Sequence, residues 1–417
     1  MNLWKSNEFL SHTFLARLQL LMRKAGHSRS DWISPICILI LSCFSLAFIY
    51  SAQNYSGGKQ WPIQIGWIIM GTGLYLAVSL INYKIYLENA HMLYIFSIIL
   101  VLLLWTPLGI KVHGCLRWVN LGISHIQPSE GAKIATLIMA ASILERSKIG
   151  NIRESFKVLL KVIGVFTPPI ILIFLQPDLG SCLVFTPMLF SLLYASKLSM
   201  RFFVTVFILF ILLMGLVVYD IVGYKEFIQK NNVSATRGSY ETQALLPLKD
   251  YQRDRLLGFA APEVLDPKGI GKSWNLRQSL ISIGSGGLFG KGHNNGTQAK
   301  LGYLPQSVAH NDFIFSVLGE EIGFVGGSLV ILIYGILIGN GIRIATLARD
   351  RFGMLLALGV SVVLMVHVFV NIGMTIGLMP ITGIPLPFLS YGGSFILSCC
   401  VSQGLIQSVY RFRRNFT

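Results

Sequence analysis

The sequence carries little charge for its length. Of its 417 residues, 12% are charged, roughly half the share usual in soluble proteins, and 53% are hydrophobic. So few charged side chains cannot cover an apolar core of this size in water. The composition therefore excludes a soluble globular protein and indicates a polytopic membrane protein.

Acidic residues are especially scarce, with 18 Asp and Glu against 34 Lys and Arg and a net charge of +16. A basic excess can indicate nucleic-acid binding, but here the basic residues lie in short clusters between apolar runs. Such clusters are typical of loops that face an anionic cytoplasmic leaflet. We therefore expect these basic residues to face the membrane surface, and we expect no nucleic-acid partner.

The six cysteines show no C-x-x-C spacing, and five of them lie inside apolar runs. This pattern favours small buried hydrophobic residues over disulfides or a zinc site. We also expect no cleavable signal peptide, because residues 1–31 are basic and no small-residue cleavage site follows them. Two alternatives stay open for this segment: an amphipathic helix over Phe9–Lys24 on the inner membrane surface, or a partly disordered tail.

Ten apolar runs approach the length of about 20 residues that a helix needs to cross a bilayer. The expected fold class is therefore all-α, a polytopic membrane protein with about ten transmembrane helices. The runs are 33–52, 61–82, 91–107, 128–145, 158–175, 179–196, 202–222, 312–338, 354–379 and 386–410.

Both termini are expected on the cytoplasmic side. An even number of spans places the two ends on one side of the membrane, and the short segments of that side hold 18 basic residues. The short loops of the other side hold three, Lys59, Lys111 and Arg117. Because basic residues accumulate on the cytoplasmic side, this difference sets the orientation.

The chain divides into a basic cytoplasmic segment (1–31), transmembrane helices 1–7 (32–222), a large extracytoplasmic loop (223–311), helices 8–10 (312–410) and a basic cytoplasmic tail (411–417). A structureless loop of this length is rare, so we expect a partly folded and functional one. No internal repeat is evident, which makes a transporter built from inverted halves less favoured.

Few acidic residues lie near the apolar runs, and each is a candidate for function because ionisable groups are costly at membrane depth. They are Glu130, Asp178, Asp220, Asp312, Glu320 and Glu321. The last two lie over two helical turns beyond Asp312, where one could face a cavity or pair with a basic group.

Each remaining candidate has a structural alternative. Glu130 and Lys133 share a helix face at i and i+3, either as a structural ion pair or as a wall of a polar cavity. Asp178, ahead of an apolar run, is suited to helix capping. Asp312 opens the eighth run at the outer surface, where it could act as a general base on an extracytoplasmic substrate or cap a helix.

Two segments have unusual backbone composition. Gly284–Gly292 is glycine-rich but lacks the spacing of a phosphate-binding P-loop, so it is either a turn or a set of N–H groups that meets a pyrophosphate beside Lys291. Residues 380–394 hold three prolines and three glycines, which indicates a fixed non-helical backbone. Such backbone is tolerated at membrane depth only where protein or a wet cavity covers it.

Several ordered motifs across residues 115–395 resemble the SEDS (shape, elongation, division and sporulation) family, and Thr382–Pro387 is similar to its elongation branch. The motifs are Arg117-Trp118, Gln127–Glu130 with Lys133, Gln176–Gly180, Tyr251–Arg253 with Arg255, Gly284–Gly292, Gly296–Gln298, His310–Phe315, Gly319–Glu321, Asn371–Gly373 and Thr382–Ser394.

The resemblance implies a peptidoglycan glycosyltransferase that polymerises lipid II at the outer face of the bacterial inner membrane during cell-wall elongation. It also implies a class B penicillin-binding protein, a transpeptidase, as partner, together with other membrane proteins of the elongation complex. A lipid II flippase and a non-catalytic scaffold of that complex are the alternative functions.

The resemblance places the catalytic aspartate on Asp312 and a polar cavity on Glu130, Lys133 and Asp178. The departing pyrophosphate needs positive charge, and its source stays open between Arg253, Arg255, Lys291 and a divalent cation, Mg²⁺ or Mn²⁺. No metal ligands are assigned. The same motifs add further substrate-binding or cavity candidates, namely Arg117, His310, Glu320, Glu321 and Ser390.

The chain departs from the family pattern near Asp312. The spacer between Leu304-Pro305 and His310 is about two residues longer than usual, and Asn311 replaces a threonine. His367 stands where the family usually has glutamine. Asp312 itself is retained, which supports the activity, while the longer spacer keeps the scaffold alternative open.

Overall fold

The computed structural model describes residues 30–413, except 55–57, 113–114, 121, 123–124, 148–151, 177, 197, 232–239, 242–243, 270 and 272. The segment Phe9–Lys24, with its two open alternatives, and the last four residues of the basic tail lie outside this part of the chain.

Helices dominate the described residues, so the protein is an all-α polytopic membrane protein as expected. Among the described residues, six helices are long and apolar enough to cross a membrane: α2, α3, α7, α9, α15 and α16. The apolar helices α5 and α8 are shorter. The ten helices of 13 residues or more are α2 (Ile33–Asn54), α3 (Gln60–Leu80), α5 (Ala90–Leu102), α6 (Pro128–Arg146), α7 (Ile152–Leu175), α8 (Leu179–Ala195), α9 (Met200–Asn231), α15 (Ile314–Thr346), α16 (Arg351–Thr375) and α17 (Gly393–Arg411).

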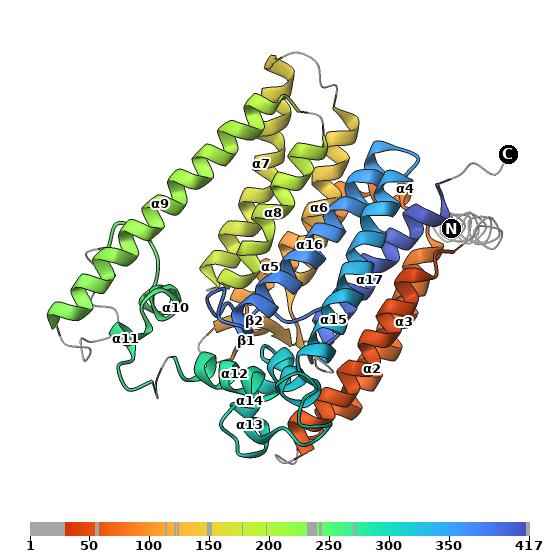
Figure 1. Cartoon of the computed structure of the whole chain (residues 1–417). Helices are drawn as coiled ribbons and strands as arrows, with labels where there is room; N and C mark the ends of the chain where they lie inside the picture. Colours follow the sequence, from red (N-terminus) through yellow and green to blue (C-terminus); the bar gives the residue numbers. More distant parts are fainter. Residues whose placement is uncertain are drawn as a thin grey trace.

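Helix α16 is the centre of the bundle (Figure 1). It packs against α6, α8, α15 and α17, and most of its residues are buried. A first hydrophobic cluster joins it to α6, α7 and α8, and a second joins it to α2, α15 and α17. Since α16 contributes to both clusters, it fixes the two halves of the bundle relative to each other.

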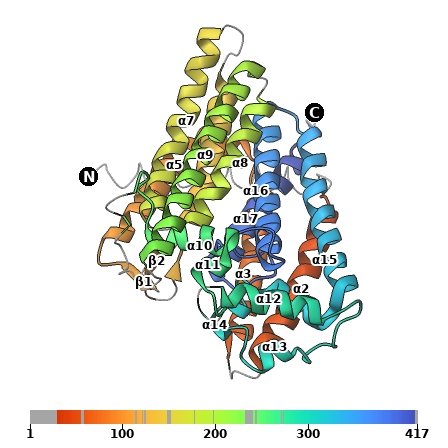
Figure 2. The ribbon, with the colours of Figure 1, turned by 60° about the vertical axis from the view of Figure 1, so that its left-hand side comes forward.

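Helix α9 stands away from the bundle along its middle (Figure 1), and in the turned view of Figure 2 it overlaps α8. Near its start it meets α8 through Phe190, whose ring centroid lies 5.8, 5.8 and 5.7 Å from those of Phe203, Phe207 and Phe210. None of the most apolar part of α9 is buried inside the protein. A helix that is apolar on all sides needs an apolar surrounding, which only lipid or another membrane helix can provide.

The segment between α9 and α15 is partly helical. It contains α10 (Asp250–Ala260), α11 (Pro262–Leu265), α12 (Trp274–Ser285), α13 (Thr297–Lys300) and α14 (Gln306–Ala309). The seventh predicted span ends at 222, whereas α9 continues to Asn231, because Tyr224 and Ile228 pack with Leu257 and Leu265 of α10 and α11. We call the end of the bundle that carries α10–α14 the loop end; it is at the bottom of Figure 1.

A small antiparallel sheet at the loop end was not expected from the sequence. Its strands are β1 (Gly109–Val112), β2 (Cys115–Asn120) and β3 (His125–Ile126), in the order β1-β2-β3. Val119 pairs with Gly109 on one side and with Ile126 on the other. The sheet connects α5 to α6 and places Arg117 at the loop end. The short helix α4 (Lys84–Glu88) and the 3₁₀ turn Leu103–Trp105 complete the described elements.

A buried polar cluster closes the opposite end of the bundle. Asp31 accepts hydrogen bonds from the backbone N–H of Ser34 at 3.1 Å, from Asn340 Nδ2 at 2.7 Å and from Arg343 Nη2 at 2.6 Å. Gln407 of α17 donates to the Asp31 backbone carbonyl at 3.2 Å. This cluster ties the start of α2 to the ends of α15 and α17.

We predict that Asp31→Ala lowers the melting temperature in detergent. The change leaves the buried amide of Asn340 without its carboxylate acceptor, which costs about 1–3 kcal/mol. Thermal unfolding monitored by size-exclusion chromatography measures the effect. Glu154→Ala removes an exposed carboxylate from the first turn of α7 and is the control. Equal melting temperatures for both variants would contradict the assigned role.

Candidate active site

Asp312 lies in the turn between α14 and α15, and two neighbouring segments hold this turn. Asn371 Nδ2 of α16 donates to the backbone carbonyl of Asp312 at 2.9 Å and to that of Ile384 at 2.7 Å. Ser390 Oγ donates to the Asn311 carbonyl at 2.6 Å and accepts from the backbone N–H of residue 386 at 2.8 Å. The predicted non-helical segment 380–394 is therefore fastened directly onto the turn that carries Asp312.

His310 and Ser390, two candidates from the sequence, contribute to this arrangement. The His310 carbonyl accepts from the backbone N–H of Tyr391 at 2.9 Å, and the two rings meet edge-on with centroids 5.4 Å apart. Gly383, with φ at +75°, faces the carboxylate, and a Cβ there would lie 3.5 Å from Asp312 Oδ2. The glycine lets the 382–391 backbone approach the carboxylate closely in a conformation that other residues rarely adopt.

The turn lies below the loop end rather than at its surface. Gln64 Nε2 donates to the Ser390 carbonyl and to Ser45 Oγ of α2, each at 3.3 Å. Ser51, near the end of α2, donates to Glu321. Ser45 and Ser51 are six residues apart, which corresponds to roughly 9 Å along a helix. The Asp312 turn is thus about two helical turns deeper than Glu321.

This depth follows from a reversal within α15. Gly323 has φ 65° and ψ −165°, so the helix consists of two segments, 314–322 and 324–346. The first runs from the depth of Ser45 to that of Ser51, toward the loop end. The second runs back across the bundle, where Asn340 donates to Ser34 Oγ at 2.8 Å. The expected span from residue 312 therefore begins only at residue 324, and Asp312 lies at the inner tip of a re-entrant segment.

The capping role considered for Asp312 is not observed. The N-cap of α15 is Phe313, and no side chain caps this helix. The Asp312 carboxyl is instead half-buried and lies outside the helix. Burial raises the pKa of Asp312 to about 6, with a further increase from Asp178, while Arg255 and Arg117 oppose the rise. A carboxyl with this pKa is largely ionised at neutral pH and can accept a proton.

Two arginines and one further carboxylate lie near enough to Asp312 to act on its charge. Arg255 Nη1 of α10 donates to the Thr382 carbonyl at 3.1 Å, which holds its guanidinium over the 382–391 segment. Arg117 Nη2 of β2 lies 3.8 Å from Asp178 Oδ1. Both guanidinium groups are close enough to Asp312 to act on its charge.

Asp178 has the capping role expected from its position. Its carboxylate accepts from the backbone N–H of Ser181 at 3.3 Å and from Ser181 Oγ at 2.8 Å, at the start of α8. It also accepts from Gln127 Nε2 at 3.3 Å. The cap and the ion pair with Arg117 use the same carboxylate, so the start of α8 fixes where Arg117 points.

Glu130 and Lys133 form both an ion pair and the wall of a cavity. Lys133 Nζ lies 2.8 Å from Glu130 Oε1 and 3.0 Å from His367 Nε2. His367 Nδ1 lies 2.7 Å from the Val363 carbonyl, so it must donate there and accept from the ammonium group with Nε2. The cavity lies between α6, α16 and α17, and its other lining residues include Leu137, Val360, Leu364, Ser398, Ser402 and Gln403.

The sequence did not indicate the role of His367. It is one helical turn from Asn371, which holds the Asp312 turn, so the cavity adjoins the site from the inner side. The departure from the family pattern at position 367 was the one available signal, and it did not identify Lys133 as the partner.

Lys291 and Glu320 belong to a second cluster, nearer the loop end. Lys291 Nζ donates to Ser285 Oγ and Thr297 Oγ1 at 2.7 Å each and to Glu320 Oε1 at 2.6 Å. These bonds use all three of its protons. The Glu320 carboxylate also accepts from the backbone N–H groups of Thr297 and Gln298 at 2.7 and 3.2 Å.

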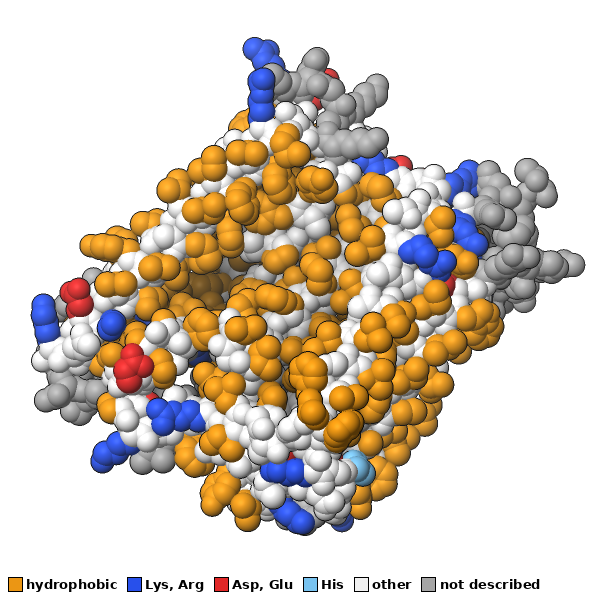
Figure 3. Space-filling model, in the orientation of Figure 1, with side chains coloured by type: hydrophobic (Ala, Val, Ile, Leu, Met, Phe, Trp, Pro, Cys, Tyr) orange, Lys and Arg blue, Asp and Glu red, His pale blue; other side chains and the backbone are white. Residues whose placement is uncertain are grey.

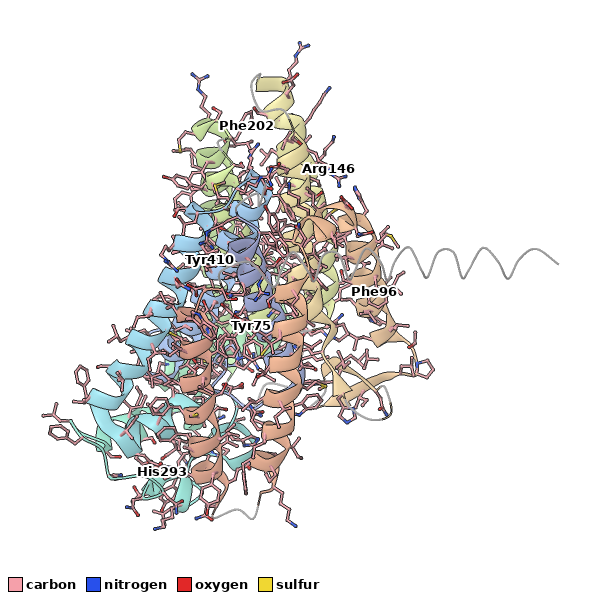
Figure 4. The ribbon with its side chains drawn as sticks, turned by 90° about the vertical axis from the view of Figure 1, so that its right-hand side faces the viewer. Tyr75, Phe96, Arg146, Phe202, His293 and Tyr410 are labelled. Carbon is pink, nitrogen blue, oxygen red and sulfur yellow. The ribbon has the colours of Figure 1, made fainter. Side chains whose placement is uncertain are left out.

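Glu321 holds the other part of the same loop. Its carboxylate accepts hydrogen bonds from Ser51 Oγ and from the backbone N–H of Asn294 at 3.0 Å. The same carboxylate lies 3.1 Å from His293 Nδ1. Figure 4 shows His293 at the loop end, far from Arg146 and Phe202 at the opposite end. The glycine-rich segment 284–292 thus ends in a turn that Lys291 fastens to the Glu320 carboxylate of α15, as in the first of its two predicted roles.

The guanidinium of Arg253 is held by contacts that do not include Asp312. It is 0% exposed, and its guanidinium donates to Asp220 Oδ2 at 2.8 Å and to the Leu246 and Leu248 carbonyls. The ring of Tyr240 lies 5.0 Å from its Cζ. Of the candidate cations, Arg255 and Arg117 approach Asp312, whereas Arg253 and Lys291 fasten the loop to α9 and α15.

Within the described residues, no three His, Cys, Asp or Glu side chains gather closely enough to hold a metal ion. Mg²⁺ is often held by one or two carboxylates together with substrate phosphates. The divalent cation therefore stays a prediction that depends on the substrate.

Fold and site together define a polytopic membrane protein with a half-buried carboxylate on which two arginines act, at the inner tip of a re-entrant segment. Residues 31–415 match the family model described as cell cycle protein, FtsW/RodA/SpoVE. The chain belongs to the FtsW/RodA/SpoVE family.

Curated relatives span nearly the whole chain. The peptidoglycan glycosyltransferase MrdB of Escherichia coli K12 is 35% identical over 379 residues, covering 91% of this chain and 93% of MrdB. The peptidoglycan glycosyltransferase RodA of Treponema pallidum is 34% identical over 440 residues, covering 93% of this chain and 99% of that RodA. The probable peptidoglycan glycosyltransferase FtsW of Trichlorobacter lovleyi is 32% identical over 400 residues, covering 94% and 96%.

Solved structures share the fold. A chain from the structure titled "Structural coordination of polymerization and crosslinking by a peptidoglycan synthase complex" aligns with a TM-score of 0.73 at 24% identity, covering 93% of this chain and 99% of that one. The rod shape determining protein RodA of Thermus thermophilus aligns with a TM-score of 0.61 at 24% identity, covering 93% of this chain and 98% of that one.

We predict that Lys133→Ala lowers the melting temperature strongly. Removing one partner of a buried ion pair leaves an uncompensated charge, here on Glu130, at a cost of about 3–5 kcal/mol. Thermal unfolding in detergent measures the loss. The double variant Glu130→Gln with Lys133→Met removes both charges and should recover part of it. A wild-type melting temperature for Lys133→Ala would show that the pair does not stabilise the fold.

Proposed function

We propose that this protein is a peptidoglycan glycosyltransferase that polymerises lipid II, with Asp312 as the general base. The observation that carries the proposal is the placement of Asp312: a half-buried carboxyl with a pKa of about 6, on a turn held from both sides by Asn371 and Ser390, and under the influence of the Arg255 and Arg117 charges. The names of the family relatives support the activity. The elongation branch is the proposed setting, since Thr382–Pro387 resembles that branch.

In the proposed reaction, a sugar hydroxyl of one substrate attacks the anomeric carbon of the other with inversion. Asp312 accepts the hydroxyl proton as the new C–O bond forms, and the bond to undecaprenyl pyrophosphate breaks. A general base near its optimal pKa contributes about 10²–10⁴-fold to such a step. Asn371 and Ser390 hold the backbone of the turn, so the carboxylate needs little reorganisation before it accepts the proton.

Arg255 and Arg117 are the proposed partners of the departing pyrophosphate. Their guanidinium groups present planar pairs of N–H donors, which match phosphate oxygens. Arg255 is only partly buried, and its guanidinium donates to the Thr382 carbonyl. Positive charge already aimed at the leaving group stabilises the charge that develops on it in the transition state.

The gap beside α9 is the proposed route for the lipid tails of both substrates. Figure 3 shows a hollow between α9 and the rest of the bundle, lined by hydrophobic side chains. The contacts of α9 concentrate near its two ends, at Phe190 of α8 and at α10 and α11. A polyprenyl chain in this gap stays in an apolar surrounding while its pyrophosphate approaches Arg255.

The proposed topology has ten transmembrane helices in the bacterial inner membrane, with both termini in the cytoplasm and the loop end outside. The basic residues of the short segments support this orientation. Helices α6 and α17, which complete the ten, are largely buried by their neighbours. Their low hydropathy is therefore compatible with a transmembrane position inside the bundle.

A class B penicillin-binding protein is the proposed partner. The structural neighbour with a TM-score of 0.73 comes from a peptidoglycan synthase complex described as coordinating polymerization and crosslinking. A transpeptidase bound to this chain would receive each glycan strand as it is made. Other membrane proteins of the elongation complex are proposed on the resemblance alone.

We predict that Asp312→Asn abolishes polymerisation while the protein stays folded, because the amide keeps the shape of the side chain but cannot accept the proton. The purified complex with its cognate class B penicillin-binding protein receives lipid II and a divalent cation, with moenomycin present to inhibit contaminating polymerases of the other type. Glycan length is measured on a gel.

Glu263→Gln is the control for that experiment, since it neutralises an exposed carboxylate on α11. Polymer from Asp312→Asn at the wild-type rate would overturn the assignment of the base. Absence of polymer from a well-folded wild-type complex would instead favour the flippase or scaffold function, which lipid II transport in sealed vesicles and partner binding would then separate.

We predict a polymerisation rate that rises with pH around 6 and then levels off, because the base must be ionised and its pKa is about 6. Arg255→Gln removes a positive charge that opposes the rise in the pKa of Asp312. The rising limb of the curve of rate against pH should therefore move to higher pH, and the maximal rate should fall. Initial rates at several pH values measure both. Lys268→Gln, an exposed cation of the same loop, should leave the limb in place. A limb unchanged by Arg255→Gln would contradict the electrostatic coupling.

A further inference from the structure

Helix α12 has its polar side facing the protein and its apolar side facing out. Gln278, Ser279 and Ser282 are buried, whereas Leu280 and Ile281 are 43% and 49% exposed. A helix on the surface of a water-soluble domain shows the opposite pattern, with apolar residues toward the core. The arrangement is that of a helix whose outer side meets an apolar medium.

Hydrogen bonds explain why the polar side is turned inward. Ser279 Oγ lies 2.6 Å from Ser316 Oγ and donates to the Thr375 carbonyl at 2.7 Å. Ser282 Oγ donates to Glu320 Oε2 at 2.9 Å. The serines thus join α12 to the re-entrant segment 314–322 and to the end of α16, while the side chains of Leu280 and Ile281 stay exposed.

The depth of α12 matches the edge of the membrane. Glu321, next to the carboxylate that α12 binds, accepts from Ser51 of α2. The neighbouring Tyr50 meets Trp61 of α3 edge-on, with ring centroids 5.8 Å apart, and both rings are exposed. Exposed Tyr and Trp near the ends of transmembrane helices mark the interface between acyl chains and head groups.

The apolar side of α12 continues into surfaces that already face lipid. Leu280 packs against the backbone of Gly377, just beyond the end of α16. The turn after α12 carries Leu288 and Phe289, which are 63% and 79% exposed. The N–H groups of Phe324 and Val325, at the start of the spanning part of α15, donate to the 287 and 288 carbonyls at 2.9 and 3.0 Å.

We infer that α12 and the 286–290 turn are inserted in the lipid leaflet at the loop end, with Leu280, Ile281, Leu288 and Phe289 among the acyl chains. Arg277 is exposed one turn before Ile281, where its guanidinium can reach the anionic head groups from the same side of the helix. This lipid contact is independent of the proposed catalysis.

The contact has a consequence for the site. Ser279 is bonded to Ser316, which lies one helical turn after Asp312 on the re-entrant segment. A leaflet that holds α12 at a fixed depth therefore also limits the movement of the segment that carries Asp312.

Spin-label accessibility tests the inference on the full chain in nanodiscs of phosphatidylethanolamine and phosphatidylglycerol, without a partner. Nitroxides are attached to Ile281→Cys and Phe289→Cys in a chain whose six native cysteines are replaced. Leu332→Cys, on the exposed side of α15, is the lipid-facing reference, and Lys268→Cys is the water-facing reference.

We predict that collisions with oxygen, relative to those with a water-soluble nickel chelate, are about as frequent at 281 and 289 as at 332, and several-fold above 268. Values like those at 268 would overturn the inference. Low collision rates with both reagents would also overturn it, because they would mean that a second copy of the chain covers this side.

If the cysteine-free chain does not fold, tryptophan fluorescence replaces the spin labels. Ile281→Trp is compared with Leu332→Trp in bilayers with and without brominated lipids, after subtraction of the wild-type emission. Quenching of the added tryptophan at 281 similar to that at 332 supports insertion, and its absence contradicts it.

Discussion

Irregular backbone inside a membrane bundle must find its hydrogen-bond partners in the protein, because lipid offers none. The turn that carries Asp312 and the proline-rich segment that follows α16 are both of this kind. They satisfy each other, with Asn371 bonded to a carbonyl of each and Ser390 joining them again. The central position of α16 follows from this requirement, since it is the helix that brings the Asn371 amide between the two segments.

The same constraint divides the cations of the loop end into two groups. Arg253 and Lys291 are surrounded by acceptors, and their bonds hold the large loop to α9 and α15. An ammonium group with three partners has no proton left for a phosphate. Arg255 and Arg117 act on the charge of Asp312 instead. The site therefore depends on the structural group of charges, which positions α10 and the glycine-rich turn around it.

Two apolar surfaces of the protein need the bilayer to cover them. Helix α9 leaves the bundle over most of its apolar length, and α12 presents leucine and isoleucine outward while its serines bind α15. One surface is suited to the polyprenyl tails of substrates and the other to the surrounding leaflet. Ser279 of α12 is bonded to Ser316, one helical turn after Asp312, so the outward-facing helix adjoins the re-entrant segment that carries the carboxylate.

Properties that depend on local composition were determined by the sequence itself. Long apolar runs are incompatible with water, so the membrane class and the transmembrane helices follow from them. The i, i+3 spacing predicts the contact of Glu130 with Lys133, and the position of Asp178 before an apolar run predicts its cap. Asp312 was a candidate because acidic residues are so few.

The contacts of the site and the depth of Asp312 were decided by the packing of distant segments, which local sequence patterns do not encode. His367 meets Lys133 from 234 positions away, and Arg117 and Arg255 come together at Asp312 from a small sheet and a loop helix. The reversal at Gly323 places the carboxylate below the surface rather than on it. A buried charge goes where the whole fold offers partners, and this is known only once all the helices are in place.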